Sequence, residues 1–134
     1  MISVDTNVII SALNQKDVNH LVARQLLSEH GSREAPVISP VVYAELMAAP
    51  GRDGVRAFLE RAEIAALVET LLELWEKAGT TFGDDAVQRR KGQLPRRIVA
   101  DFVSAAHAAH HDLKVMTLDR AVYDAAFSIE VIST

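Results

Sequence analysis

Short apolar segments alternate along the chain with longer segments of helical periodicity, and this alternation restricts the folds that the chain can adopt. The apolar segments have the composition and length of strands, and they cover residues 2–5, 36–39, 113–117 and 128–132. Strands that alternate with helices favour an α/β fold, in which helices cover both faces of a mainly parallel sheet. We therefore predict a layered α/β domain.

The helical segments are bounded by residues that commonly start or stop helices. Ser39 and Pro40 suit the N-cap and the first helical position, and Pro50 with Gly51 suits a stop. The predicted helices cover residues 8–13, 18–30, 40–49, 52–62 and 97–111, and a further short helix begins at Asp119.

The middle of the chain leaves alternatives open. Residues 63–67 fit either a marginal strand or a turn into the next helix. Residues 67–82 share one apolar helical face, on which Trp75 and Phe82 are expected in the core or in an interface. Gly79, with Gly83, can kink or split this helix.

Length and composition indicate one folded domain over residues 1–134. Hydrophobic residues make up 49% of the chain and charged residues 24%, which is typical of folded proteins rather than disordered ones. The chain has no cysteine, which excludes disulfides and thiolate metal ligands. It shows neither a signal-peptide pattern nor an apolar stretch of the roughly 20 residues that span a bilayer. We therefore expect a cytoplasmic protein that does not enter membranes.

Two acids follow apolar strands directly. Asp5 ends the first strand, and Asp119 comes just after the strand at residues 113–117. Both should lie at the carboxyl end of the sheet, where ligands bind in open α/β folds. An aspartate at such a junction also serves as a helix cap, so each residue taken singly leaves both roles open.

Two further acids lie within apolar helical segments. Apolar residues flank both of them about one turn away: Val41, Val42, Ala48 and Ala49 around Glu45, and Ile98 and Ala105 around Asp101. We expect Glu45 and Asp101 on or beside buried faces, where a carboxylate is costly unless it meets a cation or several donors. The structural alternative is a buried ion pair with Arg97 or Arg120.

Together the four acids supply the oxygen ligands that Mg²⁺ or Mn²⁺ requires. Such an ion can activate a water for attack on a phosphodiester, so no nucleophilic side chain is needed. This agrees with the absence of a Gly-x-Ser-x-Gly elbow and of a Gly-rich phosphate loop. The net charge of -4 argues against nucleic-acid binding, but neutralisation of the four acids would leave the rest of the chain uncharged.

Four segments of the sequence resemble the ordered motifs of PIN domains, most closely those of VapC-type toxins from toxin-antitoxin pairs. They are residues 4–9 (VDTNVI), 38–46 (ISPVVYAEL), 98–102 (IVADF) and 117–120 (TLDR). The likeness covers nearly the whole chain. It implies a three-layer α/β/α sandwich, Mg²⁺- or Mn²⁺-dependent cleavage of RNA, homodimers, and inhibition by a small antitoxin.

Residue roles follow from the same resemblance. The catalytic and metal-site acids are Asp5, Glu45, Asp101 and Asp119. The groups that orient these acids or the substrate are Thr6, Asn7 and Thr117. Many PIN domains have a further acid shortly after the one that matches Asp119, whereas this chain has Ala121 and Val122 there. The number of ions, one or two, stays open.

A basic run precedes the segment that contains Asp101. It comprises Arg89, Arg90, Lys91, Arg96 and Arg97. These residues can contact RNA phosphates beside the cut site, although a run of charge is more commonly a solvated surface.

His107 and His111 are one helical turn apart, a spacing that can bind a metal. The glutamate of the His-Glu-x-x-His motif is missing, so we expect His107 to pack between helices instead. The apolar excess of the N-terminal helices suits either a dimer face or an antitoxin groove.

Three alternatives to a toxin ribonuclease stay open: a non-catalytic PIN-like module for RNA binding or assembly, an RNA-processing nuclease, and a receiver-like phosphotransfer domain. The last is disfavoured because such domains cluster acids near the N-terminus, where Asp5 stands alone.

Overall fold

The computed structural model describes residues 1–69, 72–90 and 99–133. Within them, five parallel strands form one sheet in the order β3-β2-β1-β4-β5. The strands are β1 (Ile2–Val4), β2 (Pro36–Ile38), β3 (Ala65–Ala66), β4 (Lys114–Met116) and β5 (Val131–Ile132). The predicted parallel sheet is therefore confirmed, with the N-terminal strand at its centre.

The register of β1 fixes what lies beside the carboxyl end of the sheet. Ser3 pairs with Val37 on one side and with Val115 on the other. The amide of Asp5 then donates to the carbonyl of Met116 at 2.9 Å, which extends the pairing beyond β1. Because parallel strands end at the same edge, the residues after β1 and after β4 meet there.

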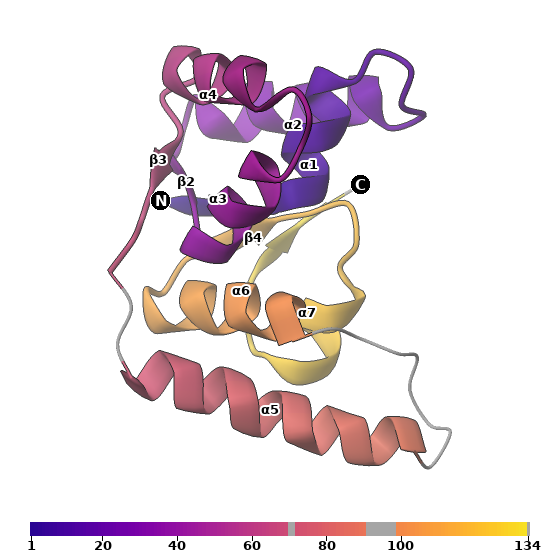
Figure 1. Cartoon of the computed structure of the whole chain (residues 1–134), viewed down its shortest axis with the longest axis vertical. Coiled ribbons are helices and arrows are strands. Elements are labelled where there is room, and N and C mark those ends of the chain that lie inside the picture. The colour runs from indigo at the N-terminus through magenta and orange to yellow at the C-terminus, as the bar shows by residue number, and fades with distance from the viewer. Residues whose placement is uncertain (70–71, 91–98, 134) are drawn as a thin grey trace.

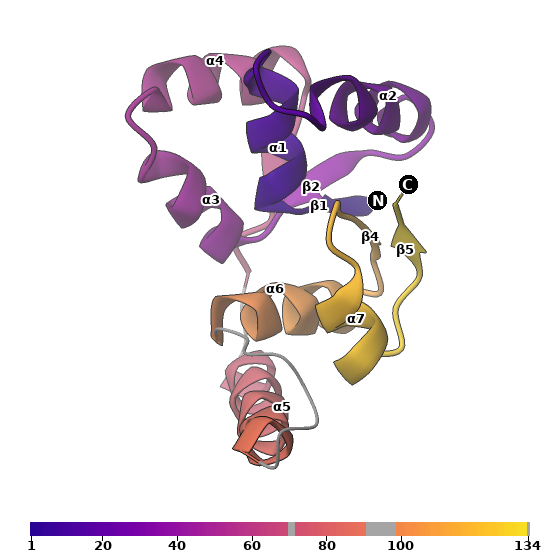
Figure 2. The ribbon, with the colours of Figure 1, turned by 90° about the vertical axis from the view of Figure 1, so that its right-hand side faces the viewer.

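Helices cover both faces of the sheet (Figures 1 and 2). On one face lie α1 (Thr6–Leu13), α2 (His20–Gly31) and α4 (Arg52–Arg61), and α3 (Pro40–Met47) adds Val42 and Leu46 to the same core. On the other face lie α6 (Val99–His110) and α7 (Ala121–Ala126). Alternate strand residues serve the two cores: Val4 and Ile38 face the first, Val37 and Val115 the second. The three-layer sandwich is thus confirmed.

The N-terminal caps of two helices follow from their sequences. Asp5 caps α1, and Ser39 caps α3 through a bond from the Val42 amide at 3.2 Å, with Pro40 in the first turn. Element ends differ from the prediction by a few residues. The first helix begins at Thr6, and the second at His20.

The undecided stretch after α4 is a turn followed by a strand. Glu63 has a φ of 55°, and the amide of Ile64 returns to the carbonyl of Leu59 at 2.9 Å, which closes the end of α4. Ala65 and Ala66 then pair with β2 although both are exposed. The Leu67 amide donates to the Ile38 carbonyl at 2.9 Å, so this residue continues the sheet and cannot start a helix.

Helix α5 (Leu72–Arg90) is continuous, so the glycines do not split it. It packs along α6 on the side away from the sheet (Figures 1 and 2). Leu74 and Ala78 are buried, and the ring of Phe82 meets that of Phe102 edge-on at 5.6 Å. This packing compensates for the low helix propensity of glycine. Trp75 is 48% exposed and does not belong to the core.

No helix in the described part of the chain is long and apolar enough to cross a membrane.

Candidate active site

All four acids singled out by the sequence line one cavity at the carboxyl edge of the sheet. Its volume is about 380 Å³. Asp5 follows β1, Glu45 comes from α3, Asp101 from α6, and Asp119 from the loop after β4. The chain leaves β1 towards β2 on one side and returns as β4 on the other, so the cavity lies where the strand order reverses. Ligands bind at this position in open α/β sheets.

Three donors hold the carboxylate of Asp5. Oδ1 accepts from the amide of Thr6 at 2.8 Å, which is the helix cap. Oδ2 accepts from the hydroxyl of Thr117 at 2.9 Å and from that of Tyr123 at 3.2 Å. Asp5 therefore caps α1 and lines the cavity with the same carboxylate.

Thr117 and Asn7 join the end of β4 to the start of α1. Asn7 donates from Nδ2 to the Thr117 hydroxyl at 3.2 Å and accepts from the Leu118 amide at 3.0 Å. The Thr117 hydroxyl also accepts from the amide of Asp119 at 3.0 Å. These contacts fix the position of the hydroxyl that reaches Asp5.

Glu45 is exposed, so it lies beside the buried face of its helix and not on it. The buried residues of α3 are Val42 and Leu46, and Glu45 lies beside them at the cavity. Its Oε1 accepts from the hydroxyl of Thr6 at 3.2 Å. Apolar neighbours one turn away did not identify the buried face, because Ala48 is exposed and Val41 and Ala49 are only half-buried.

Asp101 is half-buried and lies in the first turn of α6, where the helix dipole favours negative charge. Asp119 is exposed, and its Oδ1 accepts from the Ala121 amide at 3.2 Å at the start of α7. Arg120, one of the two alternative ion-pair partners, pairs with Asp124 at 2.8 Å. Arg97 lies outside the described residues.

The pKa values of Asp5 and Glu45 are raised in this cavity. Burial raises the pKa of Asp5, hydrogen bonds from Thr117, Thr6 and Tyr123 lower it, and the charge of Asp119 raises it. Burial also raises the pKa of Glu45, against the hydrogen bond from Thr6, and the charges of Asp5 and Asp101 raise it further. A cation in the cavity would relieve this repulsion.

Oxygen donors of this kind fit a hard divalent cation such as Mg²⁺ or Mn²⁺. Within the described ranges, no three His, Asp or Glu side chains stand close enough together to hold an ion. The four acids therefore share a cavity without forming a closed ligand cage. The donor chemistry fits the cation, and the ligand positions are those of an open site.

Two further residues, one that contacts Asp5 and one that lines the cavity, were not predicted from the sequence. Tyr123 is 2% exposed, and burial with the charge of Asp5 raises its pKa well above the ordinary value, so its hydroxyl stays a donor. A buried tyrosine usually has a partner for its hydroxyl, but the sequence does not indicate which one. Asp17, from the loop between α1 and α2, also lines the cavity and accepts from the Asn19 amide at 2.7 Å. Its sequence context is that of an ordinary loop acid.

Residues 2–128 match the family model described as PIN domain. The chain belongs to the PIN domain family. Solved structures similar to this PIN domain include VapC20 from Mycobacterium tuberculosis, with a TM-score of 0.67 at 20% identity over 96% of this chain and 97% of that one. Another is VapBC-1 from nontypeable Haemophilus influenzae, with 0.63 at 18% identity over 99% and 98%. Comparison with curated protein sequences gives no match. At these identities the structural neighbours show the fold.

The predicted RNA-binding residues of the PIN domain lie at or beyond the described end of α5. Arg89 and Arg90 are the last residues of that helix, and Lys91, Arg96 and Arg97 lie outside the described residues. Their contact with RNA stays a prediction.

His107 packs between elements of the PIN domain, as expected. It is fully buried, and its Nε2 donates to the carbonyl of Leu67 at 2.8 Å. His111 lies with its ring 4.7 Å from that of His107, and its Nε2 contacts the carbonyl of Glu69 at 3.1 Å. Both Nε2 atoms therefore bond the segment that precedes α5.

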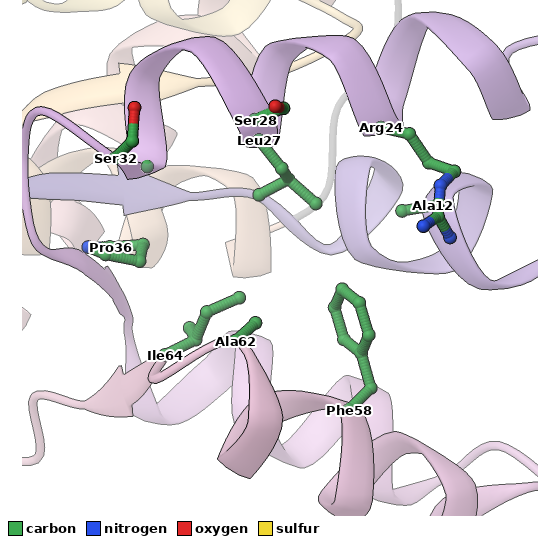
Figure 3. Close-up of a pocket in the computed structure, with 10 residues that line it drawn as sticks. Ala12, Arg24, Leu27, Ser28, Ser32, Pro36, Phe58, Ala62 and Ile64 are labelled. Carbon is green, nitrogen blue, oxygen red and sulfur yellow. The ribbon is translucent and has the colours of Figure 1, made fainter.

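A second cavity of the PIN domain, of about 400 Å³, lies between α2 and α4 (Figure 3). Leu27 faces it from α2, and Phe58 and Ile64 from the opposite wall. Arg24 is the charged member of its described lining, which contains no carboxylate. This cavity is similar in size to the acidic one, but its described lining offers no carboxylate for a divalent cation. Chemistry rather than size therefore identifies the candidate site.

Proposed function

We propose that this PIN domain is a Mg²⁺- or Mn²⁺-dependent endoribonuclease that acts in the cytoplasm as the toxin of a toxin-antitoxin pair. The observation that carries the proposal is the meeting of four acids from four distant segments in one cavity at the switch point of the sheet. Family membership supports it, and so does the similar fold of VapC20, whose structure is described as that of a sarcin-ricin loop cleaving toxin.

The acids have distinct environments that suit this reaction. The four residues that would hold the cation are Asp5, Glu45, Asp101 and Asp119. Such a cation, when bound, polarises the phosphodiester and lowers the pKa of water. Asp5 is oriented by three donors, and Glu45 by the hydroxyl of Thr6. Without a cation the pKa values of both carboxyls are raised, so a bound cation would favour their ionised forms.

RNA must overcome the negative charge of the cavity, since the phosphate backbone is also negative. Bound cation would offset part of the negative charge of the cavity, and the basic run at residues 89–97 would contact the flanking phosphates. The proposal therefore requires metal for RNA binding near the site as well as for cleavage.

Partner binding is proposed from the structural neighbours and from exposed apolar residues. Several neighbours are described as VapBC complexes, which pair a VapC protein with VapB. In this chain Val18, just before α2, is 94% exposed and Leu21, in the first turn of α2, is 77% exposed, and apolar residues that gather on a surface can form a contact patch. We propose that the protein binds a small antitoxin and forms a homodimer, which light scattering of the protein alone and with its partner would measure.

Labelled RNA incubated with purified protein tests the nuclease. Wild-type protein should cleave with Mg²⁺ or Mn²⁺ and not in EDTA, and Asp5→Asn and Asp101→Asn should each reduce cleavage by at least about 100-fold. Asp53→Asn is a matched control, because that carboxylate pairs with Arg56 on the exposed side of α4. Wild-type protein that leaves RNA intact with both ions would exclude the nuclease, and cleavage by the two site variants at the wild-type rate would exclude this site.

One observation favours a second function, a PIN-like module that binds RNA or supports assembly without cutting. No three described acids stand close enough to hold an ion in the present arrangement. Such a module would retain RNA in a filter-binding assay and release no fragments. A nuclease that processes RNA without acting as a toxin would cut RNA yet leave growth unchanged when expressed, whereas a toxin would arrest growth until its antitoxin is supplied.

A further inference from the structure

The buried side chain of Tyr123 contacts the carboxylate of Asp5, the residue that follows β1. The Tyr123 hydroxyl lies 3.2 Å from Oδ2 of Asp5, across 118 residues of sequence. Its ring belongs to the second core, together with Phe102 and Val115. Close packing holds a buried ring in one rotamer, so the Tyr123 hydroxyl has a fixed position beside Asp5.

The two carboxylate oxygens of Asp5 accept different numbers of hydrogen bonds. Oδ2 accepts two bonds, from the hydroxyls of Thr117 and Tyr123. Oδ1 accepts one, from the amide of Thr6. An ionised carboxylate has about two acceptor sites on each oxygen. Both sites of Oδ2 therefore face donors, although the Thr117 hydroxyl also lies 3.2 Å from the carbonyl of Asp119. Oδ1 retains one site.

We propose that Tyr123 is a positioning residue that, together with Thr117, leaves Oδ1 of Asp5 as the one oxygen available to a divalent cation. The inference rests on the proposed function, because it assigns Tyr123 to the same cavity. A carboxylate already held in place does not have to be ordered when a cation binds. The hydroxyl thus acts through Asp5 and does not touch substrate.

Replacement Tyr123→Phe tests this role, since it removes the hydroxyl and keeps the ring in the core. Mn²⁺ titrated into metal-free protein and followed by calorimetry is the direct readout. We expect Mn²⁺ to bind about 10-fold more weakly to Tyr123→Phe than to wild type. Tyr43→Phe is the matched control, because Tyr43 lies partly exposed on α3 and outside the cavity lining, and it should bind Mn²⁺ as wild type does.

Two further readouts separate positioning from a merely structural role. Thermal unfolding in EDTA should show a cooperative transition at a modestly lower Tm for Tyr123→Phe, because a hydrogen bond to Asp5 is lost while the packed ring is unchanged. In RNA cleavage, Tyr123→Phe should lower kcat/KM at limiting Mn²⁺ and recover with excess Mn²⁺. Recovery with excess ion is expected only if the hydroxyl acts on cation binding.

The outcomes are distinguishable. Tyr123→Phe protein that binds Mn²⁺ as tightly as wild type, or more tightly, overturns the inference. So does a loss of RNA cleavage by Tyr123→Phe that excess Mn²⁺ does not restore. Wild-type protein that binds Mn²⁺ but leaves RNA intact overturns the proposed function, while the binding comparison still decides the role of Tyr123. Wild-type protein that binds no Mn²⁺ overturns both.

Discussion

The hydroxyl of Thr117 lies 2.9 Å from Oδ2 of Asp5, although 112 residues separate them in sequence. The contact exists because β1 and β4 are neighbours in the sheet and end at the same edge. Thr117 is fully buried and also accepts hydrogen bonds from Asn7 and from the amide of Asp119. One hydroxyl therefore links the first and last of the four acid-bearing segments.

Thr117→Val should impair both the site and the fold. The variant keeps the shape of the side chain but leaves the Asn7 amide and the Asp119 N–H without their partner. We expect a loss of about 1–3 kcal/mol in the free energy of unfolding, measured in urea. Mn²⁺ affinity should fall about 10-fold. Thr117→Ser retains the hydroxyl and should keep most of both properties. Equal Mn²⁺ affinity in the Val and Ser variants would contradict a role for this hydroxyl.

Glu45→Gln should raise the stability of the metal-free protein at neutral pH. The pKa of Glu45 is raised in the folded state, so its stabilising contribution is complete below the ordinary pKa of a glutamate and is lost as the pH rises through the folded value. Removing the charge relieves repulsion from Asp5 and Asp101. The Tm of Glu45→Gln should exceed that of wild type at pH 7 and match it near pH 4.

Glu76→Gln on the exposed side of α5 is the control for Glu45→Gln and should leave Tm unchanged at both pH values. Added Mn²⁺ should stabilise wild type more than Glu45→Gln, because a cation bound to the native state raises stability by mass action. A Glu45→Gln protein less stable than wild type at pH 7 without metal would show that the acids do not repel one another.

His107 should make stability fall in mild acid. Burial lowers its pKa, and the charges of His111 and His110 lower it further, against the bond to the Leu67 carbonyl. In the described structure its Nδ1 has no hydrogen-bond partner, so a second ring proton would have no acceptor. A lowered histidine pKa means that stability is complete above about pH 6.5 and is lost as the pH falls through the folded value.

His107→Gln tests this dependence, because the glutamine amide can still donate to the Leu67 carbonyl but does not titrate. The free energy of unfolding, measured in urea between pH 5 and pH 8, should decline with acid more steeply for wild type than for the variant. His30→Gln serves as the control on α2, away from this cluster, and should keep the wild-type slope. Parallel slopes for wild type and His107→Gln would rule out His107 as the group responsible.

Gly79→Ala should stabilise α5. A Cβ added at Gly79 meets no atom within 4 Å, and the residue lies inside a continuous helix. Alanine should raise the free energy of unfolding by about 0.5–1 kcal/mol. Gly51→Ala also meets no atom, but Gly51 is the N-cap of α4, where alanine is less favourable than glycine, so no gain is expected there. A lower free energy of unfolding for Gly79→Ala than for wild type would contradict this prediction.

The sequence was sufficient to predict the sheet and its layers because strand burial and helix periodicity are local signals. Val4 and Val115 are apolar because both faces of their strands are covered, and Ser39 with Pro40 marks the start of α3 by its own chemistry. The convergence of Asp5 and Asp119 also follows from local context, since each comes after a buried strand.

Other features depended on contacts that the sequence does not encode locally. Ala65 and Ala66 form β3 only through pairing with β2, since neither residue is buried. Glu45 lies beside the buried face and not on it, which the sequence left open, because helical spacing identifies neighbours but not the face that meets the core. The hydroxyl of Tyr123 reaches Asp5 from the other end of the chain, and no local pattern reports such a partner.

The central position of β1 has a consequence for how the protein is made. Asp5 is synthesised early, but β4, which pairs with β1 and precedes Asp119, follows more than 100 residues later. At ordinary rates of translation this interval is on the order of ten seconds. During that time one edge of β1 lacks its partner and the cavity wall is incomplete. A nascent chain therefore carries no assembled acidic site, and the site comes into existence only when most of the chain has left the ribosome.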